Sequence, residues 1–163
     1  MTVIVLGIDP GTANTGYGVV LSTGQRLAAL DGGVIATDGR EPLERRLVRI
    51  HARVNDLIRQ HRPQAIAIED IYFGSNARSA FSVGQARGAV MLTAGLHGVP
   101  AYGYTPQEVK QGVCGSGRAE KAQVQRMVQS LLSLPELPQP DHAADALAVA
   151  ICHANGAPMR AAV

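Results

Sequence analysis

The opening stretch of the chain constrains the fold most, because it joins two strands through a turn that carries a carboxylate. Residues 3–8 are mostly β-branched and apolar and predict a buried strand, which Asp9 ends. Pro10-Gly11 then predicts a tight turn, and residues 16–21 (G-Y-G-V-V-L) predict an antiparallel return strand. A carboxylate at the end of a buried strand is costly unless a cation compensates it. Asp9 is therefore either a metal ligand or a cap of its own turn.

A second strand end carries a carboxylate too. Residues 65–68 (A-I-A-I) predict a short buried strand, and Glu69 ends it as Asp9 ends the first. Ligand sites in open α/β sheets usually lie at the carboxyl ends of the strands. Asp9 and Glu69 are therefore expected at the same edge of the sheet.

The rest of the chain predicts helices and strands in alternation. Residues 42–62 carry apolar residues at helical spacing, begin with Pro42 and stop before Pro63, and the arginines of this helix are mostly a solvated face. Thr105-Pro106-Gln107-Glu108 combines an N-cap, a first-turn proline and a capping-box glutamate. The other predicted elements are strands at residues 26–37, with a bulge at Gly32-Gly33, and 99–104, and helices at residues 79–96, 106–114, 118–132 and 141–155, the last of them buried and ended by Asn155 and Gly156.

Together these elements predict one α/β domain, a mixed five-stranded sheet with helices on both faces. A chain of 163 residues is long enough for one domain with a substantial core and too short for two. We expect the domain to span residues 1–156 and residues 157–163 to form a disordered tail.

Composition narrows the class of protein. Hydrophobic residues make up 46% of the chain, but no apolar run is long enough to span a bilayer. The N-terminus lacks the pattern of a signal peptide, so a cytoplasmic protein is expected, with no membrane partner. Cys114 and Cys152 lack metal-ligand spacing and are expected to be structural thiols.

The net charge of +2 says little, but the charges are unevenly distributed. Between residues 71 and 134 the acidic residues are Glu108 and Glu120 alone. The same stretch holds six basic residues, Arg78, Arg87, Lys110, Arg118, Lys121 and Arg126. A basic surface beside clustered acids suits a polyanion held at an acidic site, although an ordinary solvated surface explains this single observation equally simply.

The last predicted helix opens with D-H-A-A-D and supplies further candidates. His142 and Asp145 are three residues apart and share a helix face. Asp141 follows Pro140 and is either the N-cap or a site residue. Asp145 could be an acid that stabilises the helix dipole, but the alanines beside it and the burial of the helix weaken that explanation. Three carboxylates and an imidazole need cations. Hard oxygen ligands suit Mg²⁺ or Mn²⁺, and two such ions can hydrolyse a phosphodiester.

Several motifs resemble one family. They are G-I-D-P-G-T-x-x-T-G-Y-G at residues 7–18, A-I-E at 67–69, N-A-R-S-A-F-S-V-G-Q-A-R-G at 76–88, V-K-Q-G-V-C-G-S-G-R-A-E-K at 109–121 and A-A-D-A-L-A-V-A at 143–150. In this order, and over nearly the whole chain, they resemble the RuvC family of Holliday-junction resolvases. A single motif would be weak; the set is highly specific.

The resemblance implies an RNase H-like fold, a homodimer and a Mg²⁺-dependent endonuclease that acts in homologous recombination and DNA repair. Such enzymes make paired, symmetrical nicks across a four-way DNA junction and leave 5′-phosphate and 3′-hydroxyl ends. Asp9, Glu69 and Asp145 match the family's catalytic, metal-binding carboxylates. His142 falls where many members carry a fourth carboxylate and some carry histidine, so we expect it to complete the site. An imidazole there suits Mn²⁺ better than Mg²⁺.

The resemblance also implies DNA contacts and partners. Tyr72, and Phe73 beside it, match an aromatic position that stacks on junction bases. Lys110 and Lys121 match residues that contact phosphates, with Arg118 as a helper. Asn76 and Arg78 open the third motif and are expected to contact DNA as well. The helix at residues 79–96 is the expected dimer surface, and the RuvA and RuvB branch-migration proteins are the expected partners.

Two other functions compete with this interpretation. The G-I-D-P-G-T-x-x-T turn also resembles the phosphate-binding turn of actin-like ATPases and sugar kinases. Those proteins need a second domain of similar size, and the acids at Glu69 and Asp145 have no evident use there. An RNase H-like scaffold that binds branched DNA without cutting it would have no need of Asp9, Glu69 and Asp145.

Overall fold

The computed structural model describes residues 1–70 and 77–161, with side chains as far as residue 156. In this part of the chain ten elements follow one another: β1 (Val3–Asp9), β2 (Asn14–Ser22), β3 (Leu27–Ala36), α1 (Leu43–His61), β4 (Ala65–Glu69), α2 (Ala77–Leu96), β5 (Ala101–Tyr104), α3 (Pro106–Cys114), α4 (Lys121–Leu131) and α5 (Asp141–Ala161). The α/β class and the order of elements that the sequence predicts are confirmed.

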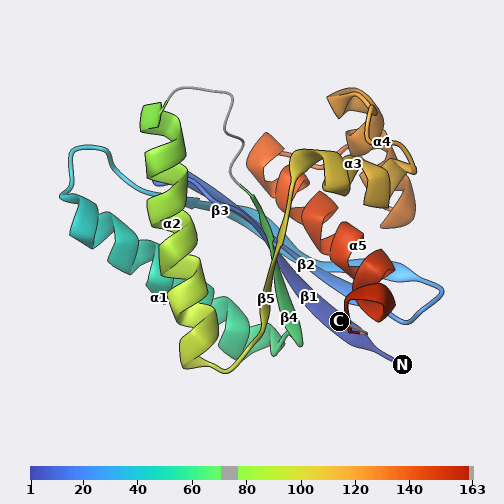
Figure 1. The fold of residues 1–163 in the computed structure, drawn as a ribbon, viewed down its shortest axis with the longest axis horizontal. Coiled ribbons are helices and arrows are strands. Elements are labelled where there is room, and N and C mark those ends of the chain that lie inside the picture. Colours follow the sequence, from blue (N-terminus) through green and yellow to red (C-terminus); the bar gives the residue numbers. More distant parts are fainter. Residues whose placement is uncertain (71–76, 162–163) are drawn as a thin grey trace.

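The sheet is mixed and has the strand order β3-β2-β1-β4-β5. β1, β2 and β3 form an antiparallel meander, whereas β4 and β5 run parallel to β1. α1 and α2 cover one face, and α5, with α3 and α4 outside it, covers the other (Figure 1). The five strands with helices on both faces agree with the sequence prediction.

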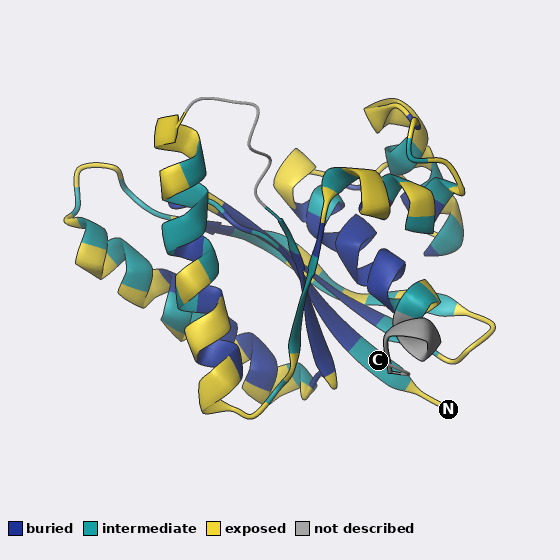
Figure 2. Cartoon of the chain, in the orientation of Figure 1, coloured by how far each residue is buried: buried dark blue, intermediate teal, exposed yellow. Residues whose placement is uncertain are grey.

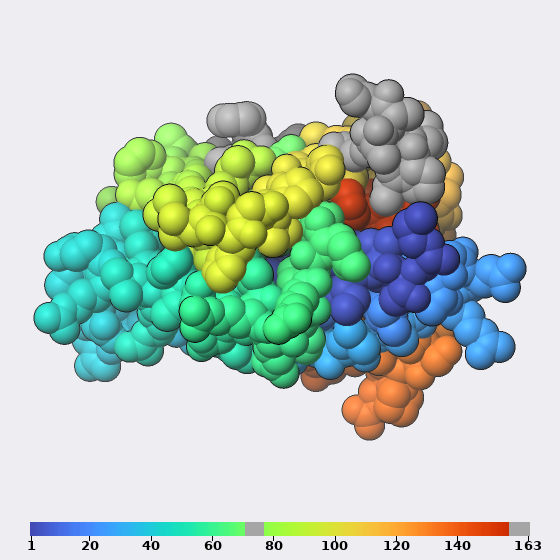
Figure 3. Space-filling view, turned by 90° about the horizontal axis from the view of Figure 1, so that it is seen from below, coloured from blue at the N-terminus to red at the C-terminus, as the bar shows by residue number. Residues whose placement is uncertain are grey.

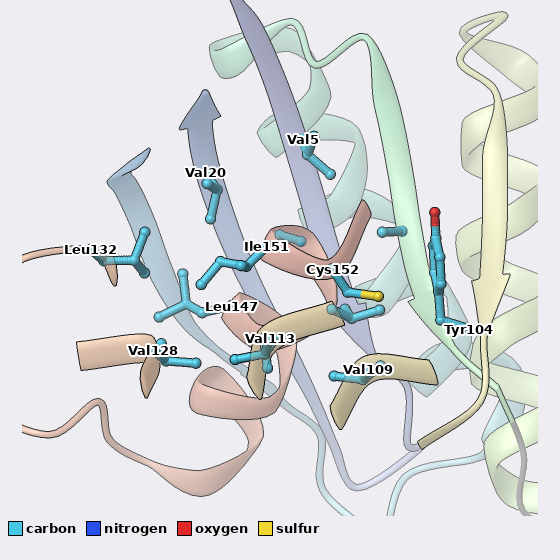
Figure 4. Packing of buried hydrophobic residues seen from close by; sticks show 14 residues of the cluster. Val5, Val20, Tyr104, Val109, Val113, Val128, Leu132, Leu147, Ile151 and Cys152 are labelled. Carbon is cyan, nitrogen blue, oxygen red and sulfur yellow. The ribbon is translucent and has the colours of Figure 1, made fainter. Parts of the chain in front are cut away.

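Two cores fill the space on either side of the sheet. Leu6 and Ile8 of β1 belong to the core beneath α1 and α2, and Val5 belongs to the core beneath α5, because successive side chains of a strand point to opposite faces. β1, β2, β4 and the middle of α5 are the most deeply buried parts of the fold (Figure 2). Figure 4 shows Leu147 and Ile151 of α5 packed between the sheet and α3.

The edge where β1 begins is closed by the segments that follow α1 and α2. The amide of Ile4 donates to the side chain of Gln64 at 2.6 Å, and the amide of Gln64 donates to the carbonyl of Ile4 at 2.9 Å. In Figure 3, which views this edge, the residues after α1 (green) lie beside the first residues of β1 (dark blue), and the end of α2 (yellow) lies on the other side of the green residues. The opposite edge, where β1 and β4 end, stays available for a site.

Helix ends follow the local signals in most places. Thr105 and Glu108 form the predicted capping box of α3, with the Glu108 amide 3.1 Å from Thr105 Oγ1 and the Thr105 amide 3.2 Å from Glu108 Oε1. α1 begins after Pro42 and ends before Pro63, as predicted. α4 begins at Lys121 instead of Arg118, because residues 116–119 form a turn in which the Arg118 amide donates to Ser116 Oγ.

Three local predictions are wrong. The bulge lies at Leu30, since Val19 pairs with Asp31 and Val20 with Ala29. Gly33 instead makes room for the Tyr17 hydroxyl, which a Cβ would approach to 2.7 Å. α5 does not end at Asn155. It continues to Ala161, because the Asn155 side chain donates to the carbonyl of Gly112 on α3 at 3.1 Å and therefore anchors the helix rather than capping it.

The third concerns Asp141, which is not the N-cap of α5. It is the first helical residue, and the carbonyl of Pro140 accepts the first helical hydrogen bond, from Ala144 at 3.0 Å.

Two other observations bear on composition. No helix in the described residues is long and apolar enough to cross a membrane. Cys114 and Cys152 do not form a disulfide.

Candidate active site

Three carboxylates meet where β1 and β4 end. Val5 and Ala67 point toward α5, and Asp9 and Glu69 lie an even number of residues further along the same strands, so they point to the same face. Ile8 pairs with Ile68 in the parallel register, which ends the two strands at one level. Asp145 approaches from α5. One oxygen from each of the three carboxylates lies within 4.8 Å of the others.

Two glycines bring α5 close enough to supply Asp145. A Cβ at Gly7 would overlap the Ala146 carbonyl, and a Cβ at Gly16 would overlap the His142 carbonyl. Gly16 pairs with Asp9 across the β1–β2 ladder. The backbone of α5 therefore rests directly on bare strand backbone beside Asp9.

Replacing Gly16 with alanine is expected to lower kcat by at least about 100-fold, because α5 must move away from the sheet and displacements near 1 Å have effects of that size. The measurement is cleavage at saturating DNA, with folding followed by circular dichroism. Gly39→Ala is the matched control, since no atom lies within 4 Å of a Cβ built there. Equal activity of the two variants would contradict the proposed role of this close approach.

The carboxylates perturb one another strongly. Burial, followed by the negative charges of Asp9 and Asp145, raises the pKa of Glu69 to about 8. Burial and the charge of Asp9 likewise raise the pKa of Asp145. In the absence of a cation the site therefore holds a proton on Glu69 at neutral pH, and binding a cation would release it.

Lys121 supplies a positive charge at the edge of this cluster. Its Nζ lies 3.2 Å from Asp141 Oδ2 and 3.9 Å from Asp145 Oδ2. Burial opposes the charge of Lys121, but the carboxylates of Asp145, Asp141 and Asp9 outweigh it and raise the pKa of the ammonium group. Lys121 therefore stays charged beside the site.

A cavity of about 250 Å³ opens next to the carboxylates, and Glu69, Asp145, Lys110 and Lys121 line it. The sequence contains no lysine apart from these two. Both therefore face the same small space, Lys110 from α3 and Lys121 from the first turn of α4. A cavity lined by both carboxylates and ammonium groups suits a metal-bound phosphate.

The remaining acidic and imidazole candidates lie at the same place. His142 Nδ1 lies 3.1 Å from Asp9 Oδ2, and the His142 side chain is 48% exposed. Asp141 binds Lys121 and also accepts a hydrogen bond from the Gln125 side chain at 3.3 Å. Asp141 thus contacts the site through Lys121, whereas His142 contacts a carboxylate of the cluster directly.

The other predicted DNA contacts are more dispersed. Tyr72, Phe73 and Asn76 lie outside the described residues. Arg78 is exposed in the first turn of α2. Arg118 is exposed too, but it lines a separate groove of about 760 Å³ on the other side of α3, so the structure does not bring it to the lysine cavity.

Two features of the site were not predicted from the sequence. One is the close packing of α5 on Gly7 and Gly16, and the other is the contact between Asp141 and Lys121. The glycines had a usable signal. Gly7 is two residues from Asp9, and Gly16 and Gly18 alternate in the facing strand, so all lie on one face of the predicted hairpin. The Asp141–Lys121 pair had no such signal, because the two residues belong to different helices.

The residues present fit a divalent metal ion. Their donors are hard carboxylate oxygens on three separate elements, which is the ligand type that Mg²⁺ and Mn²⁺ prefer. Burial and the negative charges of Asp9 and Asp145 raise the pKa of Glu69, and these are effects that a divalent cation would counter. A bound cation removes that strain, and His142 adds a nitrogen donor beside Asp9.

Solved structures of known proteins share this fold. Two solved structures match over nearly the full chain at 44% identity: RuvC of Thermus thermophilus (TM-score 0.91, covering 96% of each chain) and the same organism's RuvC in complex with a Holliday junction substrate (TM-score 0.93, covering 97% of this chain and 96% of that one). The fold is therefore RNase H-like, as the resemblance implies.

Sequence comparison gives the same family. The RuvC from Geobacter sp. (strain M21) is 50% identical over 158 residues, which are 97% of this chain and 96% of that protein. The family profile described as crossover junction endodeoxyribonuclease RuvC matches residues 5–153, from β1 to within α5. The chain therefore belongs to the RuvC family of crossover junction endodeoxyribonucleases.

Proposed function

We propose that this chain resolves four-way DNA junctions by paired nicks, with divalent metal ions bound by Asp9, Glu69 and Asp145. One observation carries the proposal: three carboxylates from β1, β4 and α5 converge within 4.8 Å beside a cavity that holds both lysines. The similar Thermus protein binds a Holliday junction substrate, which supports the same substrate class here.

The reaction is phosphodiester hydrolysis. A water oxygen forms a bond to phosphorus while the bond to the 3′ oxygen breaks, which leaves a 3′-hydroxyl and a 5′-phosphate. Divalent ions at such a site activate the water and stabilise the charge on the leaving oxygen. Glu69 must lose its proton to become a ligand, so metal binding and deprotonation are coupled.

The lysines complete the site. Lys110 and Lys121 line the same cavity as Glu69 and Asp145, so their ammonium groups hold the phosphate and reduce the repulsion between it and the acids. Asp141 restrains Lys121 before DNA arrives, through the 3.2 Å ion pair. His142 keeps its ring beside Asp9 and, as a nitrogen donor, shifts the preference of the site toward Mn²⁺.

The proposal includes a homodimer formed through α2. Phe81, Leu92 and Leu96 of this helix are 71%, 61% and 69% exposed, an apolar surface of the kind that marks an interface. Gly88 and Gly95 have no atom within 4 Å of a Cβ built there, so a partner helix can approach closely. A two-fold axis between two copies gives two sites for two symmetry-related nicks. RuvA and RuvB remain proposed partners, and sedimentation equilibrium measures the dimer.

A cleavage assay tests the proposed function. Purified protein is incubated with a synthetic four-way junction and with a linear duplex of the same sequence, in Mg²⁺ and in Mn²⁺. We expect nicks in the junction at paired positions, products that a DNA ligase can seal, and no cutting of the duplex. Junction binding without nicks in either metal would support a binding scaffold instead.

Replacing Lys121 with alanine is expected to weaken junction binding and to lower the salt slope of log Kd by about one unit, because one phosphate contact is lost. Fluorescence anisotropy at several salt concentrations gives the slope. Arg59→Ala is the control, since Arg59 lies with Pro63 and Val99 around a groove at the opposite edge of the sheet. An unchanged slope for Lys121→Ala would remove this residue from the phosphate contacts.

A further inference from the structure

α2 makes two polar contacts with the residues that follow β1 and β4, the strands that end in Asp9 and Glu69. The first contact joins Ser82 of α2 to Thr12, whose hydroxyls form a hydrogen bond. Thr12 is buried, three residues after Asp9, and its carbonyl also accepts a hydrogen bond from the Thr37 hydroxyl. The turn after Asp9 is therefore held between α2 and Thr37, the residue that follows β3.

The second contact joins Arg87 of α2 to Asp70, the residue after Glu69. The guanidinium Nη2 lies 2.8 Å from Asp70 Oδ1, and both side chains are about two-thirds buried, with 30% and 31% exposure. The Asp70 amide donates to the Tyr104 carbonyl of β5 at 2.7 Å. Asp70 is thus fixed through its backbone to β5 and through its carboxylate to α2.

β5 is shaped to receive this ion pair. A Cβ at Gly103 would lie 2.4 Å from Asp70 Oδ1 and 2.9 Å from Arg87 Nη2. The pair therefore rests on bare strand backbone, as α5 does at Gly16. An exposed ion pair on a flexible loop contributes little to stability. A partly buried pair that packs closely against a strand restrains the backbone around it.

We propose that α2 positions two of the three metal-binding carboxylates, with Arg87 acting through Asp70 on Glu69 and Ser82 acting through Thr12 on Asp9. The inference rests on the proposed function for the role of the carboxylates. Arg87 and Ser82 are positioning residues, because neither contacts the cluster itself. α2, which carries the exposed apolar surface, is therefore also the helix that holds the ends of β1 and β4 in place.

The test replaces Arg87 with glutamine in the full-length protein and measures Mn²⁺ affinity by electron paramagnetic resonance without DNA. Removing a group that orients metal ligands typically costs 10- to 100-fold in metal affinity or activity, and we expect about tenfold here in Mn²⁺ affinity and in kcat. Junction affinity in Ca²⁺ and the mass from sedimentation should stay as in the wild type. Arg87→Lys keeps the ion pair and should restore most of both losses.

Arg49→Gln is the matched control, because Arg49 of α1 forms an exposed ion pair of 3.2 Å with Glu41, just before that helix, and contacts neither Asp70 nor Thr12 in the hydrogen bonds and ion pairs of the described residues. Mn²⁺ affinity and kcat within about twofold of the wild type in Arg87→Gln, or a loss equal to that of Arg49→Gln, would overturn the inference. If Arg87→Gln does not fold, Ser82→Ala takes its place, with a smaller loss of Mn²⁺ affinity expected and an unchanged affinity contradicting the inference. Failure of the wild type to cut junctions would overturn the proposed function instead, while the Mn²⁺ measurement still reports on α2.

Discussion

Asparagine in place of Asp9 is expected to reduce junction cleavage by more than about 100-fold, because even groups that only orient metal ligands cost 10- to 100-fold when removed. Asp9 is the shared member of the cluster. Its carboxylate contacts His142 at 3.1 Å and acts on the pKa of Glu69 and of Asp145. Asparagine keeps the shape of the side chain and removes its charge, so the fold and junction binding should survive.

Single-turnover cleavage and anisotropy in Ca²⁺ separate these effects. Asp56→Asn is the control, since Asp56 is an exposed acid on α1, on the other face of the sheet from the cluster. A variant of Asp9 that loses binding and folding along with activity would show that Asp9 is structural, the alternative that its turn position suggested at first. Activity within about tenfold of the wild type would remove Asp9 from the metal site.

Glutamine in place of Glu69 is expected to have opposite effects on activity and on stability. Cleavage should fall by more than about 100-fold, as for Asp9. The metal-free protein, however, should become more stable above pH 7, because the wild-type carboxyl has its pKa raised to about 8 by burial and by Asp9 and Asp145. Glutamine removes the charge that the folded state disfavours.

The sign follows from proton linkage. The folded protein holds the Glu69 proton up to about pH 8, whereas the unfolded chain releases it near the ordinary value of 4.5. The stabilisation is fully present below pH 4.5 and is lost as the pH rises toward 8. With Glu69 partly exposed, the loss is on the order of 2 kcal/mol, or roughly 4–8 °C in Tm.

Thermal unfolding in EDTA between pH 5 and 9 measures this effect. The wild type should lose stability across that range and Glu69→Gln should lose less, while added Mn²⁺ should stabilise the wild type most at high pH. Glu108→Gln is not a suitable control, because Glu108 closes the capping box of α3. Glu136→Gln, an exposed acid between α4 and α5, is suitable. Parallel curves for the wild type and Glu69→Gln would contradict the raised pKa.

The site was predictable from the sequence where strand periodicity decides it. Asp9 and Glu69 each end an apolar run, and the parallel register of β1 and β4 brings them together as the pattern predicts. Asp145 was identifiable from the D-H-A-A-D start of a buried helix and from the resemblance to the RuvC family. These are local patterns, and the structure keeps them because β1 and β4 end at Asp9 and Glu69 and Asp145 lies in the second turn of α5.

Contacts between distant elements were not predictable in the same way. Lys121, the first residue of α4, meets Asp141, the first residue of α5, because the two helix starts pack together in the folded chain. Arg87 looks like any basic residue of α2 until β5 provides the bare backbone at Gly103. The continuation of α5 past Asn155 likewise depends on a partner carbonyl on α3. Such contacts follow from packing, which periodicity does not encode.

Asp9, Glu69 and Asp145 are proposed to bind the metal ions with which the junction is cut. Anomalous diffraction from a crystal of the chain soaked in Mn²⁺ tests it most directly. We expect anomalous peaks within coordination distance of oxygens from all three carboxylates, with His142 adjoining the ion at Asp9. Mn²⁺ peaks elsewhere, with none among these carboxylates, would show that Asp9, Glu69 and Asp145 do not form the metal site.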